Sequence, residues 1–278
     1  MKRKTAMLLV VCTAVFSLTA CGSSSTEESS SAEETIEYVD ESEIAEVFTS
    51  PDDYKGKYIT LIGEVFNDIG TDDGYVYYQA YYDIPNYDDS FVFYLSAEAE
   101  TYSEDDYVKL EGKIMGSFEG ENILGTEIEC PMIEVVSIEE ISYIDAVVPT
   151  ITEVVPEDAA AEQYGVSLQI DKIEFAETET RIYLTETNNS DDTFDMFTYS
   201  MAVVQDGQQY DMDLSSETDY YADLEELSDD IYPGATSSGV VIFPALDSTI
   251  DFQLIAEGYS DNYDLDFDSF VIDVKLSE

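Results

Sequence analysis

The sequence contains no histidine, no tryptophan and few basic residues: ten lysines and arginines stand against 63 aspartates and glutamates, which gives a net charge of −53 at pH 7. Because histidine is absent, a Ser-His-Asp triad, a Cys-His pair and an imidazole metal site are all excluded. Nucleic acid is excluded as a partner, since binding it requires lysine and arginine to neutralise phosphates. The acidic surface should keep the protein soluble and favour cationic partners or metal ions.

The N-terminus has the residue order of a secretory signal. Basic residues occupy positions 2–4, and an apolar run extends from Ala6 to Phe16. That length is typical of a signal peptide and is too short for a membrane span, which needs about 20 apolar residues. The run is followed by Leu18-Thr19-Ala20-Cys21-Gly22 and then by serines.

This stretch resembles the lipobox of bacterial lipoproteins of the Gram-positive type. The resemblance implies that residues 1–20 are a lipoprotein signal peptide and that a diacylglyceryl group is attached to Cys21. The mature protein would then be lipid-anchored at the cell surface, on the outer face of the cytoplasmic membrane. The alternative is ordinary secretion with cleavage after a small residue, which would leave Cys21 as a free thiol.

Residues 21–37 are mostly Ser, Glu and Thr, so they cannot bury enough apolar surface to offset their ordering entropy. We expect a flexible tether. If Cys12 leaves with the signal peptide and Cys21 carries lipid, Cys130 is the one remaining cysteine, and no intramolecular disulfide or multi-cysteine metal site can form. We expect Cys130 to act as a small buried hydrophobe.

Residues 38–142 predict a first domain of one helix and five strands. An acidic N-cap segment at 40–43 precedes apolar residues spaced as on a short amphipathic helix, which should end before Pro51. Alternating or aromatic-rich runs then predict strands. These runs are Ile59 to Val65, Tyr75 to Tyr82, Phe91 to Leu95, Tyr107 to Ile114 and Met132 to Ile138.

Two of these strands contain a glycine near the middle, which permits the sharp bend of a small closed barrel. The pattern resembles the oligonucleotide/oligosaccharide-binding (OB) fold, in particular the small barrels of Gram-positive lipoproteins. The matching stretches are 51–57, Ile59 to Val65 and Val108 to Ile114. The resemblance implies an OB-like barrel whose ligands bind on the face of its second and third strands.

Tyr75, Tyr77 and Tyr81 would lie on that face if residues 74–82 form one regular strand. Aromatic rings can stack on ligands, but nearby aspartates would oppose a phosphate backbone. A neutral glycan or a cationic peptide therefore fits better. The alternative is that these tyrosines are simply good strand formers.

Residues 143–163 contain two prolines and no sustained alternation, which predicts a linker. Residues 164–278 then predict seven short strands and an acidic segment at 220–228 that faces solvent. One predicted strand runs from Met196 to Val204 and forms a hairpin across Asp206-Gly207. Seven short strands separated by turns are typical of a β-sandwich.

The order of these segments resembles the telokin-like immunoglobulin modules of Gram-positive lipoproteins. The segments are 165–175, the strand ending at 188–190, the Asp206-Gly207 hairpin, and 232–234 leading into 240–243. The resemblance implies an Ig-like β-sandwich and leaves its function undefined. The predicted fold class is therefore mainly β, with a short leading helix, an OB-like barrel and an Ig-like sandwich.

With 63 carboxylates every spacing of two acidic residues occurs by chance, so no catalytic pair is singled out and we predict that the protein is not an enzyme. We predict no cofactor, and calcium is the one candidate that the composition still allows. The candidate ligands are Asp261, Asp264, Asp266 and Asp268, or else Asp72 and Asp73. The first group lacks the glycine and closing glutamate of an EF-hand, and its alternation is also typical of the solvated face of a strand.

These features favour a surface-anchored lipoprotein that acts as a non-catalytic binding or envelope-assembly module. Its expected partners are the membrane, through lipid on Cys21, and a protein, cationic peptide or neutral glycan. One alternative is a solute-capture receptor for a transporter, although such receptors usually have large α/β lobes. Another is a calcium-stabilised adhesion module.

Overall fold

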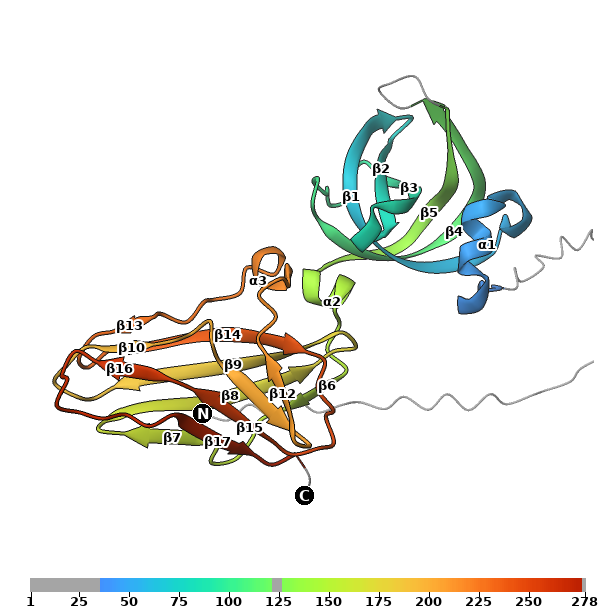
Figure 1. Ribbon diagram of the computed structural model, residues 1–278. Helices are drawn as coiled ribbons and strands as arrows, with labels where there is room; N and C mark the ends of the chain where they lie inside the picture. Colours follow the sequence, from blue (N-terminus) through green and yellow to red (C-terminus); the bar gives the residue numbers. More distant parts are fainter. Residues whose placement is uncertain (1–35, 122–126, 277–278) are drawn as a thin grey trace, which may run out of the picture. The chain divides into compact units, whose positions relative to one another are not determined.

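The computed structural model describes residues 36–121 and 127–276, which are mainly β as predicted (Figure 1). The predicted signal peptide, Cys21 and all of the predicted tether except Ile36 and Glu37 lie outside the described residues. No helix among the described residues is long and apolar enough to cross a membrane.

The predicted short helix is present as α1 (Ile44–Thr49), which follows a 3-10 turn at Glu41–Glu43. Its apolar side is anchored by Val47, which is fully buried in the core of the first set of strands. Phe48 stacks on Tyr82 with 4.9 Å between ring centroids. The helix ends before Pro51, which begins a second 3-10 turn (Pro51–Tyr54).

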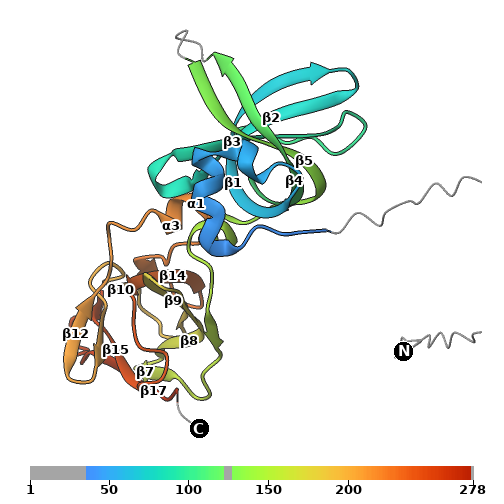
Figure 2. The same ribbon diagram turned by 90° about the vertical axis from the view of Figure 1, so that its right-hand side faces the viewer.

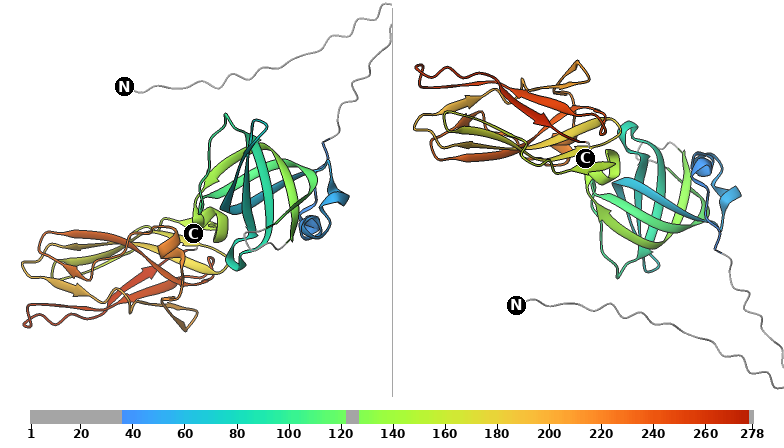
Figure 3. Two further views of the ribbon diagram at one scale, coloured as in Figure 1. Left: turned by 90° about the horizontal axis from the view of Figure 1, so that it is seen from above. Right: turned by 90° about the horizontal axis from the view of Figure 1, so that it is seen from below.

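Five strands form a closed barrel in the order β1-β2-β3-β5-β4 (Figures 1 and 3). The ring is closed by the antiparallel pairing of β1 with β4 and by a parallel pairing of β3 with β5, in which Val92 lies opposite Met132. The strand bounds are β1 (Tyr58–Asp72), β2 (Tyr75–Asp83), β3 (Asp88–Ser96), β4 (Tyr107–Glu121) and β5 (Glu127–Ile141).

The strand glycines permit close packing inside this barrel. A Cβ atom on Gly63 would lie 2.8 Å from both Phe91 Cε1 and the Tyr81 carbonyl oxygen, and one on Gly112 would lie 2.3 Å from Ile133 Cγ2. Neither position has room for a side chain, so both glycines are required by the tight curvature. Alternate residues of β2 and β3, such as Val76, Tyr78, Phe91 and Phe93, point into the barrel core.

The strands after the barrel form three sheets (Figures 1 and 2). A five-stranded sheet contains β14-β9-β8-β6 with β7 also paired to β8, a four-stranded sheet has the order β12-β11-β15-β17, and a three-stranded sheet has the order β13-β10-β16. The bounds are β6 (Thr152–Val154), β7 (Ala160–Gln163), β8 (Val166–Phe175), β9 (Glu179–Asn188), β10 (Phe194–Met196), β11 (Ala202–Gln205), β12 (Gln208–Asp211), β13 (Asp230–Ile231), β14 (Thr236–Pro244), β15 (Phe252–Ala256), β16 (Gly258–Ser260) and β17 (Phe270–Val274).

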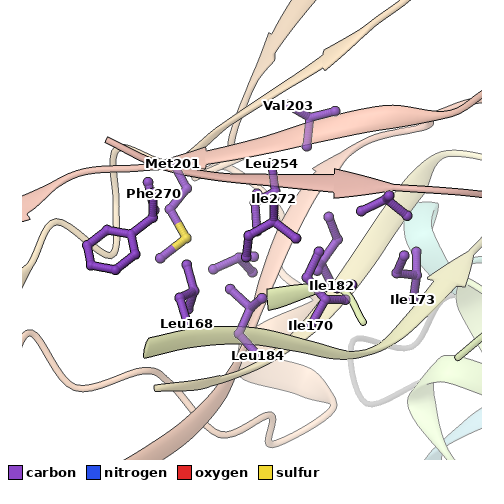
Figure 4. Packing of buried hydrophobic residues seen from close by; sticks show 14 of the residues in the cluster. Leu168, Ile170, Ile173, Ile182, Leu184, Met201, Val203, Leu254, Phe270 and Ile272 are labelled. Atoms are coloured by element: carbon purple, nitrogen blue, oxygen red, sulfur yellow. The ribbon is translucent and has the colours of Figure 1, made fainter. Parts of the chain in front are cut away.

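A second hydrophobic core joins these sheets (Figure 4). Leu168 and Ile170 of β8 and Leu184 of β9 point toward Leu254 of β15 and Ile272 of β17, and all five are buried. The five-stranded and four-stranded sheets are therefore the two layers of a sandwich. The predicted alternation of Phe270, Ile272 and Val274 produces this packing, because every second residue of β17 points inward.

After residue 142 the structure differs from the sequence predictions in four places. The short strands β13 and β16, which both pair with β10, were not predicted. The segment 143–163, predicted to be a linker, contains α2 (Tyr143–Val147) and the strands β6 and β7, both of which pair with β8. The predicted strand from Met196 to Val204 is split, because a turn in which Ser200 N–H donates to the Phe197 carbonyl moves the chain from one sheet to another. The segment 220–228 is not wholly solvent-facing, since Leu227 is buried in the sandwich core. The domain boundaries at 142 and 164 stay predictions.

Candidate functional site

The tyrosines of the predicted ligand-binding face lie on the outside of the barrel. Because successive residues of a strand point to opposite sides, the inward orientation of Val76 and Tyr78 turns Tyr75 and Tyr77 outward. On the neighbouring strand β3, Tyr94 lies directly opposite Tyr77 and also points outward. Strands β2 and β3 thus bring three tyrosines onto one surface.

These three residues, Tyr75, Tyr77 and Tyr94, form what we call the tyrosine cluster. The ring centroids of Tyr77 and Tyr94 are 5.2 Å apart with a tilted arrangement, and those of Tyr75 and Tyr94 are 5.4 Å apart and nearly perpendicular. Tyr75 is 40% exposed, and the other two are half-buried. The rings support one another while leaving part of their surface open to a ligand.

Tyr81 does not share these ring contacts. It stacks on Phe66 with 3.9 Å between centroids and makes an edge contact with Tyr87 at 5.6 Å. Phe66 is available for this stacking because it lies in a bulge of β1, where the pairing with β2 is interrupted between Val65 and Asn67. Tyr81 also lies four positions after Tyr77, which is about 13 Å along a strand. The predicted face is therefore two aromatic groups rather than one.

Tyr94 was not among the candidate residues from the sequence. The signal that could have found it is its place in the aromatic-rich run Phe91 to Leu95, but only the register of β3 against β2 pairs it with Tyr77. Burial raises the pKa of the Tyr94 hydroxyl, and the nearby Glu134 carboxylate and the other two tyrosines raise it further. The hydroxyl therefore stays protonated at neutral pH and can donate a hydrogen bond.

Acidic residues lie at both ends of β2: Asp72 and Asp73 are at the end next to Tyr75, and Asp83, Asp88 and Asp89 are at the other end, beyond Tyr81. Asp72, Asp73, Asp88 and Asp89 are all exposed, and Asp83 is half-buried. Asp73 and Gly74 form the two-residue turn between β1 and β2, with φ of 45° and 85°. The structure thus gives Asp72 and Asp73, the second candidate calcium pair, a place in a tight hairpin.

The first candidate calcium group lies in an irregular segment between β16 and β17. Asp261, Asp264, Asp266 and Asp268 are all exposed. The segment is held through its backbone: Gln163 Nε2 donates to the Asp268 carbonyl at 2.7 Å, and Asp268 N–H donates back to Gln163 Oε1 at 2.9 Å. Within residues 36–121 and 127–276, no group of three or more acidic or cysteine side chains is arranged to hold a metal ion.

Cys130 is buried, as expected, and is a free thiol. Burial raises its pKa to about 11, although hydrogen bonds from the Val92 backbone and the Ser90 hydroxyl act in the opposite direction. The thiol is therefore protonated at neutral pH and unreactive. This is the behaviour of a packing residue rather than of a nucleophile.

No family model matches the sequence, and no curated protein matches it. Among solved structures, the chain is similar to one described as a functionally unknown protein from Listeria monocytogenes EGD-e. The TM-score is 0.31 at 11% sequence identity, and the match covers 43% of this chain and 91% of the other.

Proposed function

We propose that the protein is a surface-anchored lipoprotein whose OB-like barrel is a non-catalytic binding module, followed by an Ig-like sandwich. The observation that carries the proposal is the tyrosine cluster, in which the outer face of β2 and β3 presents three mutually packed, partly exposed rings. Two features support the OB assignment: the five strands form a closed barrel, and the tyrosine cluster lies on the second and third strands, where OB folds bind their ligands. The N-terminal lipobox sequence supports the anchoring.

The surroundings of the cluster favour a neutral glycan or a cationic peptide as the ligand. The flat faces of Tyr75, Tyr77 and Tyr94 suit the apolar face of a sugar ring or an aliphatic side chain. Asp72 and Asp73, at the turn next to Tyr75, repel anionic polymers and attract cationic groups.

The binding proposal is tested with Tyr77→Ala and Tyr94→Ala in full-length protein. Each variant removes about 1 kcal/mol of ring contact and should weaken binding about fivefold for any neutral oligosaccharide or cationic peptide that the parent protein binds. Tyr232→Ala is the matched control, because this tyrosine is 65% exposed and lies far along the chain, before β14. Titration calorimetry against a panel of both ligand classes gives the dissociation constants.

If the Tyr77 and Tyr94 variants bind as tightly as the Tyr232 control, the tyrosine cluster is not the binding face. A turnover activity that survives purification and is lost on a single Asp or Glu substitution would contradict the non-catalytic role. For the anchor, Cys21→Ala should release the protein from membranes or leave it unprocessed. Unchanged membrane partitioning of that variant would contradict the lipoprotein assignment.

A further inference from the structure

The sandwich has a groove of about 440 Å³ on the outer face of its five-stranded sheet. Tyr183 of β9 and Val240 of β14 form the floor, and they are paired with each other in the sheet. One wall is formed by Asp171 and Lys172 of β8. The other wall is the segment that runs past the edge of β14, with Leu224 at its centre. This volume is within the range of small-molecule sites.

The wall formed by residues 223–227, which we call the edge segment, is held in place by the sheet itself. Val240 N–H donates to the Glu225 carbonyl at 2.9 Å, and the Leu227 side chain is buried in the sandwich core. A Cβ on Gly239 would lie 2.4 Å from the Leu227 nitrogen, so only glycine allows the segment to lie this close. The groove is therefore a built feature of the fold rather than a gap beside a free loop.

The charge of the groove is negative. Three acidic residues, Asp171, Asp223 and Glu225, line it together with one cation, Lys172. The Lys172 ammonium is already neutralised, because it lies 2.5 Å from Glu174 Oε1 and 3.7 Å from a Glu153 carboxylate oxygen. The acidic residues on both walls therefore leave an excess of negative charge around an apolar floor.

Lys172 also shows how a cation fits against this floor. Its Nζ lies 4.0 Å from the centroid of the Tyr183 ring, within the range of a cation–π contact. An aliphatic ammonium from outside would place its carbon chain along Leu224, Val240 and the part of the Tyr183 ring that Lys172 does not cover. Its charged end would then meet the acidic walls, in the way that lysine side chains lie along apolar surfaces.

We propose that this groove binds an aliphatic ammonium group, namely the side chain of a lysine in a peptide. Apolar contact with the floor selects a long carbon chain, and charge complementarity with Asp171, Asp223 and Glu225 selects a cation over a neutral or anionic end. The site is on the sandwich and uses none of the residues of the tyrosine cluster. Its occupancy is therefore independent of the proposed function of the barrel.

The test compares two probes on the purified full-length protein by ligand-observed NMR titration. Nα-acetyl-lysine amide should bind with a dissociation constant on the order of 1 mM. Nα-acetyl-norleucine amide, which has the same carbon chain without the ammonium, should bind at least about fivefold more weakly. Raising the ionic strength should weaken the binding of the lysine probe but not that of the norleucine probe, since salt screens interactions between exposed charges.

Two pairs of substitutions with the same charge change separate the groove from general surface charge. The double variant Asp223→Asn with Glu225→Gln should bind the lysine probe about fivefold more weakly, or worse. Glu177→Gln with Asp191→Asn, at exposed positions outside the groove, should leave it unchanged. Equal affinity for the two probes, or equal loss in the two double variants, would overturn the proposal. The Tyr77 and Tyr94 variants test the tyrosine cluster with neutral oligosaccharides, whereas the Asp223 and Glu225 variants test the groove with the lysine probe, so the two sites can fail separately.

Discussion

Glu186 is expected to make the stability of the sandwich fall as pH rises. Its side chain is fully buried, on the inward-facing side of β9 between Leu184 and Asn188. Both of its carboxyl oxygens lack a hydrogen-bond partner, which holds for no other buried side-chain oxygen or nitrogen among the described residues. Burial raises its pKa from 4.5 to about 8, and the nearby Asp229 carboxylate contributes in the same direction.

The direction and size of the effect follow from proton linkage. Below about pH 4.5 Glu186 is protonated in both the folded and the unfolded chain, so it adds no pH dependence. Between pH 4.5 and 8 the folded state holds a proton that the unfolded state has released, and the free energy of unfolding falls by about 1.4 kcal/mol per pH unit. The loss is about 3 kcal/mol at pH 7 and levels off at about 5 kcal/mol above pH 8.

The perturbation is Glu186→Gln, which keeps the shape of the side chain and is neutral at every pH. The variant should match the parent near pH 4.5 and exceed its stability by an increasing margin up to pH 8, reaching about 3 kcal/mol at pH 7. Urea unfolding followed by near-ultraviolet circular dichroism of the tyrosines gives the free energy at each pH. Taking the difference between the two proteins removes the shared titration of the other carboxylates.

Glu177→Gln is the matched control, because this glutamate is exposed in the turn between β8 and β9. It should change the free energy of unfolding by no more than about 0.5 kcal/mol at any pH. If the difference between Glu186→Gln and the parent is the same at pH 5 and pH 8, Glu186 titrates normally. The burial argument for its raised pKa would then be refuted.

Three further predictions concern charge, reactivity and metal. Arg181 is fully buried and donates hydrogen bonds of 2.6 to 3.1 Å to Glu174, Glu179, the Val148 carbonyl and Thr150. Arg181→Ala should therefore lower the free energy of unfolding, measured by urea titration, by about 3–5 kcal/mol. A loss below about 1 kcal/mol would contradict this prediction. The control is Lys275→Ala, which removes an exposed ion pair and should cost less than about 1 kcal/mol. The buried Cys130 thiol should resist iodoacetamide in the folded protein and react with it after unfolding, which mass spectrometry would detect. Rapid labelling of the folded protein at pH 7 would contradict the raised pKa of this thiol. If calcium stabilises the protein through Asp261 to Asp268, a chelator should lower the melting temperature, and an unchanged value excludes that alternative.

The regular strands were largely predictable, because alternation between inward and outward residues is a local property. The predicted strand from Val166 to Phe175 is β8 with the same bounds, and the Asp206-Gly207 turn joins β11 and β12 as expected. Strand ends were less accurate: β1 continues to Asp72 and β4 to Glu121, well beyond the predicted Val65 and Ile114. These extensions are stabilised by pairing with β2 and β5, which no local pattern encodes.

The candidate site was predictable in part. The sequence placed Tyr75 and Tyr77 on one face through their spacing of two, but the register of a neighbouring strand adds Tyr94 and a bulge in β1 separates Tyr81. The groove beside Tyr183 had no sequence signal, because its two walls come from segments about 50 residues apart that only the folded sheet brings together.

By itself the sequence determined the acidic character of the protein, the exclusion of histidine chemistry and the mainly β fold, because composition and short-range periodicity carry these properties. Only the tertiary structure decided which polar groups are buried away from solvent. Glu186 and Arg181 are two ionisable residues on the same strand, and nothing in the local sequence distinguishes them from the many exposed ionisable residues. The packing of distant segments leaves the Glu186 carboxyl group without a hydrogen-bond partner and gives the Arg181 guanidinium four groups that accept its hydrogen bonds. Because both side chains are buried, the presence or absence of these partners has a large effect on the free energy of folding.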